Sequence, residues 1–178
     1  MPRNLFDREL DELHNELTKM GHQVDVILCE TIQVLKERDI DAARKIFLQD
    51  EEISLKERTI ESKCMSIIAL QQPLASDLRT ITAVLKIVTD MERISDQCYD
   101  ICEIVATIFS SGSSAPPAKI IKMFENAREM FADALSAFLS VDEMLAKRVC
   151  ERDNHIDSLF SAVILELCNA MEGRQSAI

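Results

Sequence analysis

The fold of this chain is decided by residues 66–98, SIIALQQPLASDLRTITAVLKIVTDMERISDQC. On both sides of Pro73, apolar residues recur every three or four positions, which is the period of a helix with one buried face. Pro73 has no backbone N–H to donate, so it ends the first helix and can stand at an early position of the next. The segment therefore predicts two long antiparallel helices joined by a tight turn.

The rest of the chain continues this pattern, and the composition agrees with it. Three Gly, four Pro, no Trp and 47% apolar residues in a chain of 178 are typical of long helices. Either Asp39 or Asp41 can cap the start of a second helix. We predict an all-α fold whose first three helices form an up-down-up bundle. The five long helices are expected at about residues 4–37, 39–70, 74–108, 118–140 and 142–172.

The chain repeats itself across a short linker. Residues 110–117, SSGSSAPP, are rich in small and helix-breaking residues. DIDAARKIFLQDEEI (39–53) resembles DEMLAKRVCERDNHI (142–156), and Asp50 corresponds to Asp153. The second repeat has two helices where the first has three, so we expect its bundle to be incomplete and to lack a final helix. The predicted division is a first repeat at 1–110, a linker at 111–117 and a second repeat at 118–178.

The net charge and the cysteines exclude some functions and indicate where the protein is located in the cell. A formal net charge of −11 argues against non-specific binding to nucleic acid or anionic lipid, because both need positive patches. No run of 18 apolar residues is present, and the N-terminal MPRNLFDREL lacks the apolar core of a signal peptide. The six cysteines show no C-x-x-C spacing and have apolar neighbours, as buried free thiols do. We therefore expect a cytoplasmic protein with reduced thiols.

Three carboxylates in the third predicted helix, those of Glu92, Asp96 and Asp100, are spaced four residues apart. Side chains at this spacing lean from one helix face with Cβ atoms roughly 5–6 Å apart, so two of them can bind one cation. Carboxylate oxygens suit hard or borderline ions such as Mg, Mn, Fe or Ca. Asp50 and Asp96 lie at similar separations from the turn at 71–73, so antiparallel packing brings them level. These four acids form the predicted metal site.

A simpler interpretation of the acidic row stays open. Arg93 can pair with Asp96 three positions later, which would make the row an ordinary solvated helix face. Asp90 is a flanking acid of the same row. His14, His22 and His155 are scattered over different helices and are expected at the surface.

The region around residues 66–98 resembles the signature region of the PhoU family, which comprises phosphate-signalling regulators of bacteria and archaea. The resemblance extends over essentially the whole chain and agrees with its internal repeat. It is carried by three groups of residues: Gln71-Gln72-Pro73, Asp77-Leu78-Arg79 and Asp90-x-Glu92-Arg93-x-x-Asp96.

This resemblance implies two three-helix bundles related by a pseudo-twofold axis, with metal ions held by paired E(D)-x-x-x-D motifs. Fe, Mn, Mg and Zn are candidate ions. It also implies a non-enzymatic regulator that represses phosphate-starvation signalling between the phosphate ABC transporter Pst and a sensor kinase of the PhoR type. The sequence departs from the family pattern at Ser95, where Gly is frequent, and at Ser54, where a second acid is missing. In the second repeat, only Asp153 and Asp157 remain as metal ligands.

Two other functions fit parts of the sequence. A helical scaffold or interaction protein without metal would use its acids only for solubility. A di-iron carboxylate enzyme would need Glu-x-x-His on two helices, and the residues three before the histidines are Asp11, Lys19 and Arg152. Because the second repeat cannot cover its apolar face with two helices, we also expect the chain to form a homodimer through that repeat.

Overall fold

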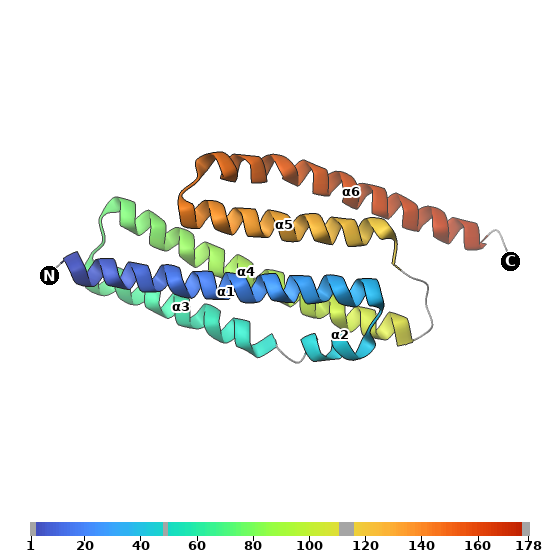
Figure 1. The fold of residues 1–178 in the computed structure, drawn as a ribbon, viewed down its shortest axis with the longest axis horizontal. Coiled ribbons are helices and arrows are strands. Elements are labelled where there is room, and N and C mark those ends of the chain that lie inside the picture. The colour runs from blue at the N-terminus through green and yellow to red at the C-terminus, as the bar shows by residue number, and fades with distance from the viewer. Residues whose placement is uncertain (1–2, 48–49, 111–115, 176–178) are drawn as a thin grey trace.

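The computed structural model describes residues 3–47, 50–110 and 116–175, and this part of the chain contains helices and no strand (Figure 1). The prediction of an all-α fold is therefore confirmed. The elements are α1 (Arg3–Glu37), α2 (Ile40–Phe47), α3 (Asp50–Gln71), α4 (Ala75–Ser110), α5 (Ala118–Ser140) and α6 (Glu143–Gln175).

The predicted second helix, from Asp39 or Asp41 to about Leu70, is described as two elements, α2 and α3, and residues 48–49 between them lie outside the described residues. The buried Ala43, Ile46 and Ile53 follow one helical period over both elements, so the sequence pattern indicates a single helix. Residues 50–52 are all acidic, and carboxylates are favoured in the first turn of a helix because they complement its dipole. The corresponding residues 153–155 of α6 are Asp-Asn-His, and α6 continues through them.

The first repeat is a bundle in which α1, α3 and α4 pack on one another and α2 packs mainly on α4. Its core is a continuous cluster of aliphatic and sulfur-containing side chains. Burying one such large side chain stabilises the fold by roughly 1.5–3 kcal/mol. The largest fully buried members include Leu13, Leu17, Met20, Ile60, Ile81 and Met91.

The cysteines divide into two classes. Cys64, Cys98 and Cys102 are buried, and burial raises the pKa of Cys64 and Cys98 to about 11. The other three, Cys29, Cys150 and Cys168, are exposed, so the expectation of buried thiols holds for half of them.

The turns between α1 and α2 and between α5 and α6 have the same construction. Arg38 and Val141 adopt the left-handed backbone conformation that ends a helix, at φ 59° and 54°. The next residue caps the following helix in both places: Asp39 Oδ1 accepts from the N–H of Ala42, and Asp142 Oδ1 from that of Leu145, at 2.9 Å each. Of the two caps proposed for the second helix, Asp39 is therefore the one found. The two repeats therefore share the same left-handed residue and the same helix cap, in addition to their similar sequences.

The second repeat is a hairpin of α5 and α6 that lies against the first repeat through α5 and α1 (Figure 1). α6 packs on α5 and leaves large apolar side chains exposed on its outer face. The exposed apolar surface expected for the second repeat is therefore present. None of the described helices is both long and apolar enough to cross a lipid bilayer. The exposed residues on this outer face include Phe160, Ile164, Leu165, Leu167 and Met171.

Candidate functional site

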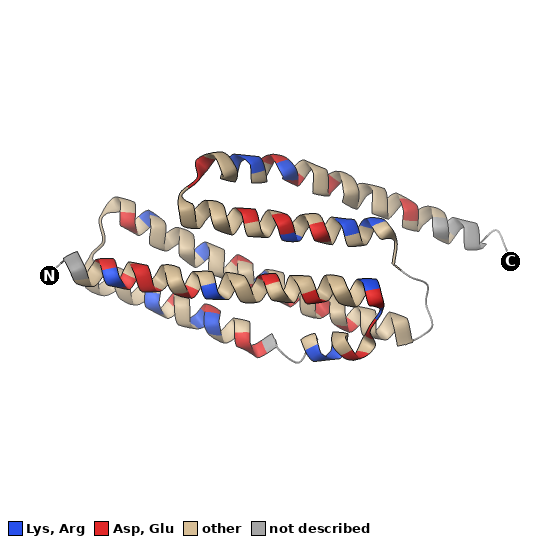
Figure 2. Cartoon of the chain, viewed as in Figure 1, with Lys and Arg blue, Asp and Glu red and all other residues tan. Residues whose placement is uncertain are grey.

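The predicted acidic row lies on α4, where Glu92 and Asp96 are partly buried and Asp100 is exposed. α3 packs antiparallel to α4, and Ser54 Oγ donates a hydrogen bond of 3.3 Å to Glu92 Oε1. The row therefore begins at the junction of α3 and α4 and passes outward to solvent at Asp100. Acidic and basic residues are interspersed along the helices around it (Figure 2).

Two further carboxylates reach this junction from α3. Burial raises the pKa of Glu57, and the negative charges of Glu92 and Glu61 raise it further. A hydrogen bond from Thr89 acts in the opposite direction. Glu57 and Glu61 were not predicted from the sequence, and their spacing of four residues on α3 is the signal that could have identified them.

Arg93, the possible partner of Asp96, lies 3.6 Å from Asp90 Oδ1 through its Nη1 atom. Both side chains of this pair are exposed, so solvent screens their attraction. Asp96 itself makes an interaction within the structure. The solvated-face interpretation therefore applies to Asp90 and Arg93, on the outer side of α4.

The other predicted ligands are Asp50, Asp153 and Asp157. Asp50 is the first residue of α3, and its side chain lies outside the described residues. Asp153 and Asp157 are exposed on α6. Among the residues that the structure describes, no three His, Cys, Asp or Glu side chains converge closely enough to hold a metal ion. Metal binding by these six acids stays a prediction.

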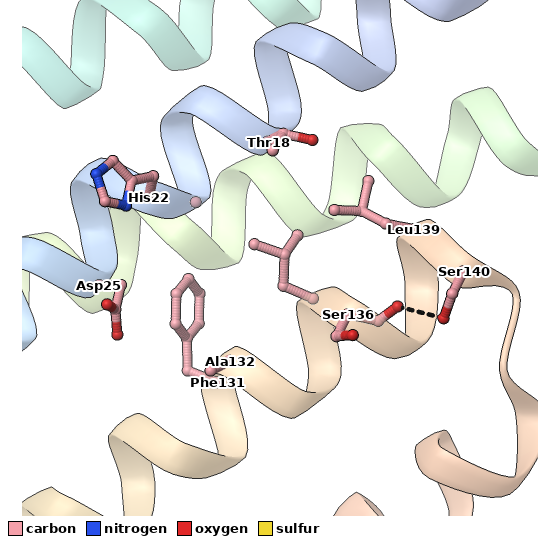
Figure 3. Close-up of a pocket in the computed structure, with 10 residues that line it drawn as sticks. Thr18, His22, Asp25, Phe131, Ala132, Ser136, Leu139 and Ser140 are labelled. Carbon is pink, nitrogen blue, oxygen red and sulfur yellow. Dashed lines mark hydrogen bonds between the residues drawn. The ribbon is translucent and has the colours of Figure 1, made fainter.

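A hollow of about 450 Å³ lies between α1 and α5 (Figure 3). Its walls are mainly apolar, with Phe131, Leu135 and Leu139 from α5, and His22 and Asp25 lie at its rim on α1. Ser140 Oγ donates to the backbone carbonyl of Ser136, so this hydroxyl is engaged locally. This lining suits an apolar side chain of a partner better than it suits a reacting substrate.

Ion pairs join the elements of the second repeat to each other and to α1. Arg128 on α5 makes two contacts with Asp25 on α1, and Lys36 Nζ lies 2.7 Å from Glu125 Oε1. Arg152 on α6 contacts Glu129 and Asp133 on α5. The pairs to α1 connect helices that are distant in sequence, the pairs of Arg152 connect consecutive helices, and none of them was predicted from the sequence.

Comparison with known proteins gives a consistent result. The family model described as PhoU domain matches residues 17–105 and 120–178. A phosphate-specific transport system accessory protein PhoU homolog from Clostridium acetobutylicum is 33% identical over 179 residues, which cover 100% of this chain and 82% of that protein. The phosphate-specific transport system accessory protein PhoU of Escherichia coli is 28% identical, over 93% of this chain and 69% of its own length.

Solved structures agree with the sequence comparisons. The crystal structure of PhoU from Pseudomonas aeruginosa superposes with a TM-score of 0.91 at 29% identity, covering 97% of this chain and 83% of that one. The phosphate transport system regulatory protein PhoU from Streptococcus pneumoniae superposes with a TM-score of 0.87 at 26% identity, covering 94% and 79%. The similarity therefore includes both repeats.

Proposed function

The chain belongs to the PhoU family, and on that premise we propose that it regulates phosphate uptake and phosphate-starvation signalling. The observation that carries the proposal is similarity along the whole chain to proteins named as accessory to the phosphate-specific transport system. The close superposition on two PhoU crystal structures supports it further.

The protein acts by binding partners in the cytoplasm and not by catalysing a reaction. Its partners are the components of a Pst-type phosphate transporter and a sensor kinase of the PhoR type. Support for the transporter comes from the names of the relatives, and the kinase is an expectation from the family resemblance. Shallow, mainly apolar hollows such as the one between α1 and α5 are suited to side chains of a protein partner.

A metal ion on the acidic face of α3 and α4 is a second part of the proposal. Glu92 and Asp96 are its ligands, with Asp50 and Asp100 as further donors. Glu57 lies beside this face, where burial first and then the negative charges of Glu92 and Glu61 raise its pKa, and a cation would offset the repulsion among these carboxylates. Asp153 and Asp157 on α6 form the weaker candidate site. Fe, Mn, Mg and Zn remain the candidate ions, since oxygen ligands alone do not select among them.

The third part of the proposal is a homodimer formed through α6. Phe160, Ile164 and Leu167 are exposed on one face of that helix, and exposed apolar patches of a few hundred Å² usually mark an interface. At roughly 25 cal/mol per Å², burying even about 600 Å² favours association by about 15 kcal/mol before the entropic costs of binding.

A complementation experiment tests the regulatory role. The chain is expressed in a bacterium that lacks its own PhoU-family protein and carries a reporter driven by a phosphate-starvation promoter. We expect repression at high phosphate, and affinity capture should retain Pst components and the sensor kinase. A reporter that stays fully active while the folded chain is abundant would overturn the proposal.

The variant Glu92→Ala/Asp96→Ala separates the regulatory role from the metal. If it represses like the parent chain and contains equally little metal, the chain is a scaffold that works without a bound ion. If it loses both metal and repression while staying folded, the acidic face belongs to the regulatory site.

A further inference from the structure

The firmest polar contact between the two repeats joins residues that correspond to each other. Arg128 Nε and Nη2 donate to Asp25 Oδ1 and Oδ2 at 2.7 and 2.9 Å, and the two residues are 103 positions apart. The helix caps Asp39 and Asp142 are separated by the same interval. Asp25 on α1 and Arg128 on α5 therefore occupy the same position in the two repeats.

A contact between equivalent positions shows where the axis that relates the two repeats lies. α1 and α5 run antiparallel to each other (Figure 1). When two equivalent antiparallel helices pack, each position faces a different one except near the local twofold axis, where a position meets its own equivalent. The Asp25–Arg128 pair therefore lies beside the axis that relates the repeats.

The hollows along the α1–α5 pair support this axis independently. The first, of about 450 Å³, is lined by His22 and Leu135 among others. A second, of about 640 Å³, is lined by Glu125 and Ile32, which are their equivalents in the other repeat. Asp25 borders both hollows, and Arg128 borders the second.

We infer that Asp25 and Arg128 form a clasp on the local twofold axis, which fixes the angle at which the two repeats pack. If the two repeats were identical, the same side chain from each would lie beside the axis, and two equal charges there would repel each other. The two repeats have diverged, so that α1 carries the carboxylate of Asp25 and α5 carries the guanidinium of Arg128. These two groups form a pair of parallel hydrogen bonds, which fixes their relative orientation. The inference requires neither phosphate nor a partner, so it stands apart from the proposed function.

The Lys36–Glu125 pair provides an internal comparison. It joins the same two helices through one contact of 2.7 Å, and its members are not equivalent positions. Its side chains are 43% and 33% exposed, against 38% and 29% for Arg128 and Asp25. A single-contact pair that is more exposed restricts orientation less, so it serves as a matched control.

The test is a charge exchange in the full chain. Asp25→Arg and Arg128→Asp each place two like charges on the axis, and each should raise the unfolding equilibrium constant on the order of tenfold. Because the two positions are related by symmetry, the double exchange restores the same contact with its ends reversed, and most of this loss should be recovered. In the control pair, Lys36→Glu places two carboxylates side by side away from the axis and should show a smaller effect. The reversal is made at Lys36 because Glu125 also lies 3.7 Å from Lys122.

A distance measurement distinguishes an orienting clasp from a merely stabilising one. Spin labels are attached to Cys168 on α6 and to an introduced Ser62→Cys on α3, with Cys29 and Cys150 replaced by Ser. The parent and the double exchange should give the same narrow distance distribution, and the single reversals a shifted or broadened one. Unchanged distributions in the single variants, or a double exchange no better than the sum of its singles, would overturn the inference. If a reversal fails to fold, Asp25→Asn and Arg128→Gln give the same comparison without like-charge repulsion.

Discussion

The packing of α1 against α5 depends on the absence of a side chain at Gly21. A Cβ atom at this position would clash with Cδ2 of Leu135 and would lie 3.4 Å from Cε of Met91. Gly21→Ala removes the helix penalty of glycine, a gain of roughly 0.5–1 kcal/mol, but displaces the end of the Leu135 side chain at a cost of roughly 1–3 kcal/mol. The difference is a net loss of about 0–2.5 kcal/mol, and we expect a value near the middle of this range.

The effect of Gly21→Ala on stability should change sign when Leu135 is also replaced. Leu135→Ala removes the atoms that the new methyl group would meet, so in that background Gly21→Ala should stabilise the chain by about 0.5–1 kcal/mol through helix propensity alone. Urea unfolding of the four proteins, followed by far-ultraviolet circular dichroism at one protein concentration, measures this cycle. A Gly21→Ala effect of the same sign and size in both backgrounds would show that Leu135 does not require the glycine.

Three further outcomes are expected. Glu92→Ala/Asp96→Ala should lower the amount of divalent metal that co-purifies with the chain. The variant should stay folded, because it removes the repulsion between two like charges four residues apart on the helix. An unchanged metal content by elemental analysis would contradict the proposed site. The parent chain should sediment as a dimer at micromolar concentration, and Phe160→Glu/Ile164→Glu as a monomer; a parent that is a well-behaved monomer near 20.1 kDa contradicts the interface. Glu57→Gln should stabilise the fold at pH 7. The raised pKa means that native Glu57 binds its proton more tightly than the unfolded chain does, so its contribution is favourable below the usual value of 4.5 and is lost as the pH rises through the native pKa. The stabilisation by Gln should therefore shrink on acidification, and urea midpoints that differ equally at pH 4 and pH 7 would contradict this cause.

The helices could be predicted from the sequence because their signals are local. The apolar period, Pro73 and the capping Asp39 lie within a few residues of the boundaries that they set, and α5 begins and ends at the predicted residues 118 and 140. The start of α3 at Asp50 was not predicted because the apolar period is the same before and after it. In the sequence, only the acidic residues 50–52 mark this start.

The contacts between repeats could not be predicted in the same way. The interval of 103 residues was available from the sequence, but it does not say which face of α1 meets α5. Asp25 and Arg128 are ordinary charged residues of amphipathic helices until that face is known. Gly21 is a similar case, because its importance comes from Leu135 on another helix.

Equivalent residues of the two repeats differ in how deeply they are buried. Cys64 of α3 is fully buried against its neighbours, whereas its equivalent in α6, Leu167, is 37% exposed. Glu57 lies at the junction with α4, and its equivalent, Phe160, is 55% exposed. The second repeat therefore carries the more apolar side chains on the face that its described residues leave less covered. Exposing apolar side chains to water is unfavourable, so this face is stabilised when another helix packs against it. The α6 helix of a second copy, as in the proposed homodimer, would offer the same apolar stripe.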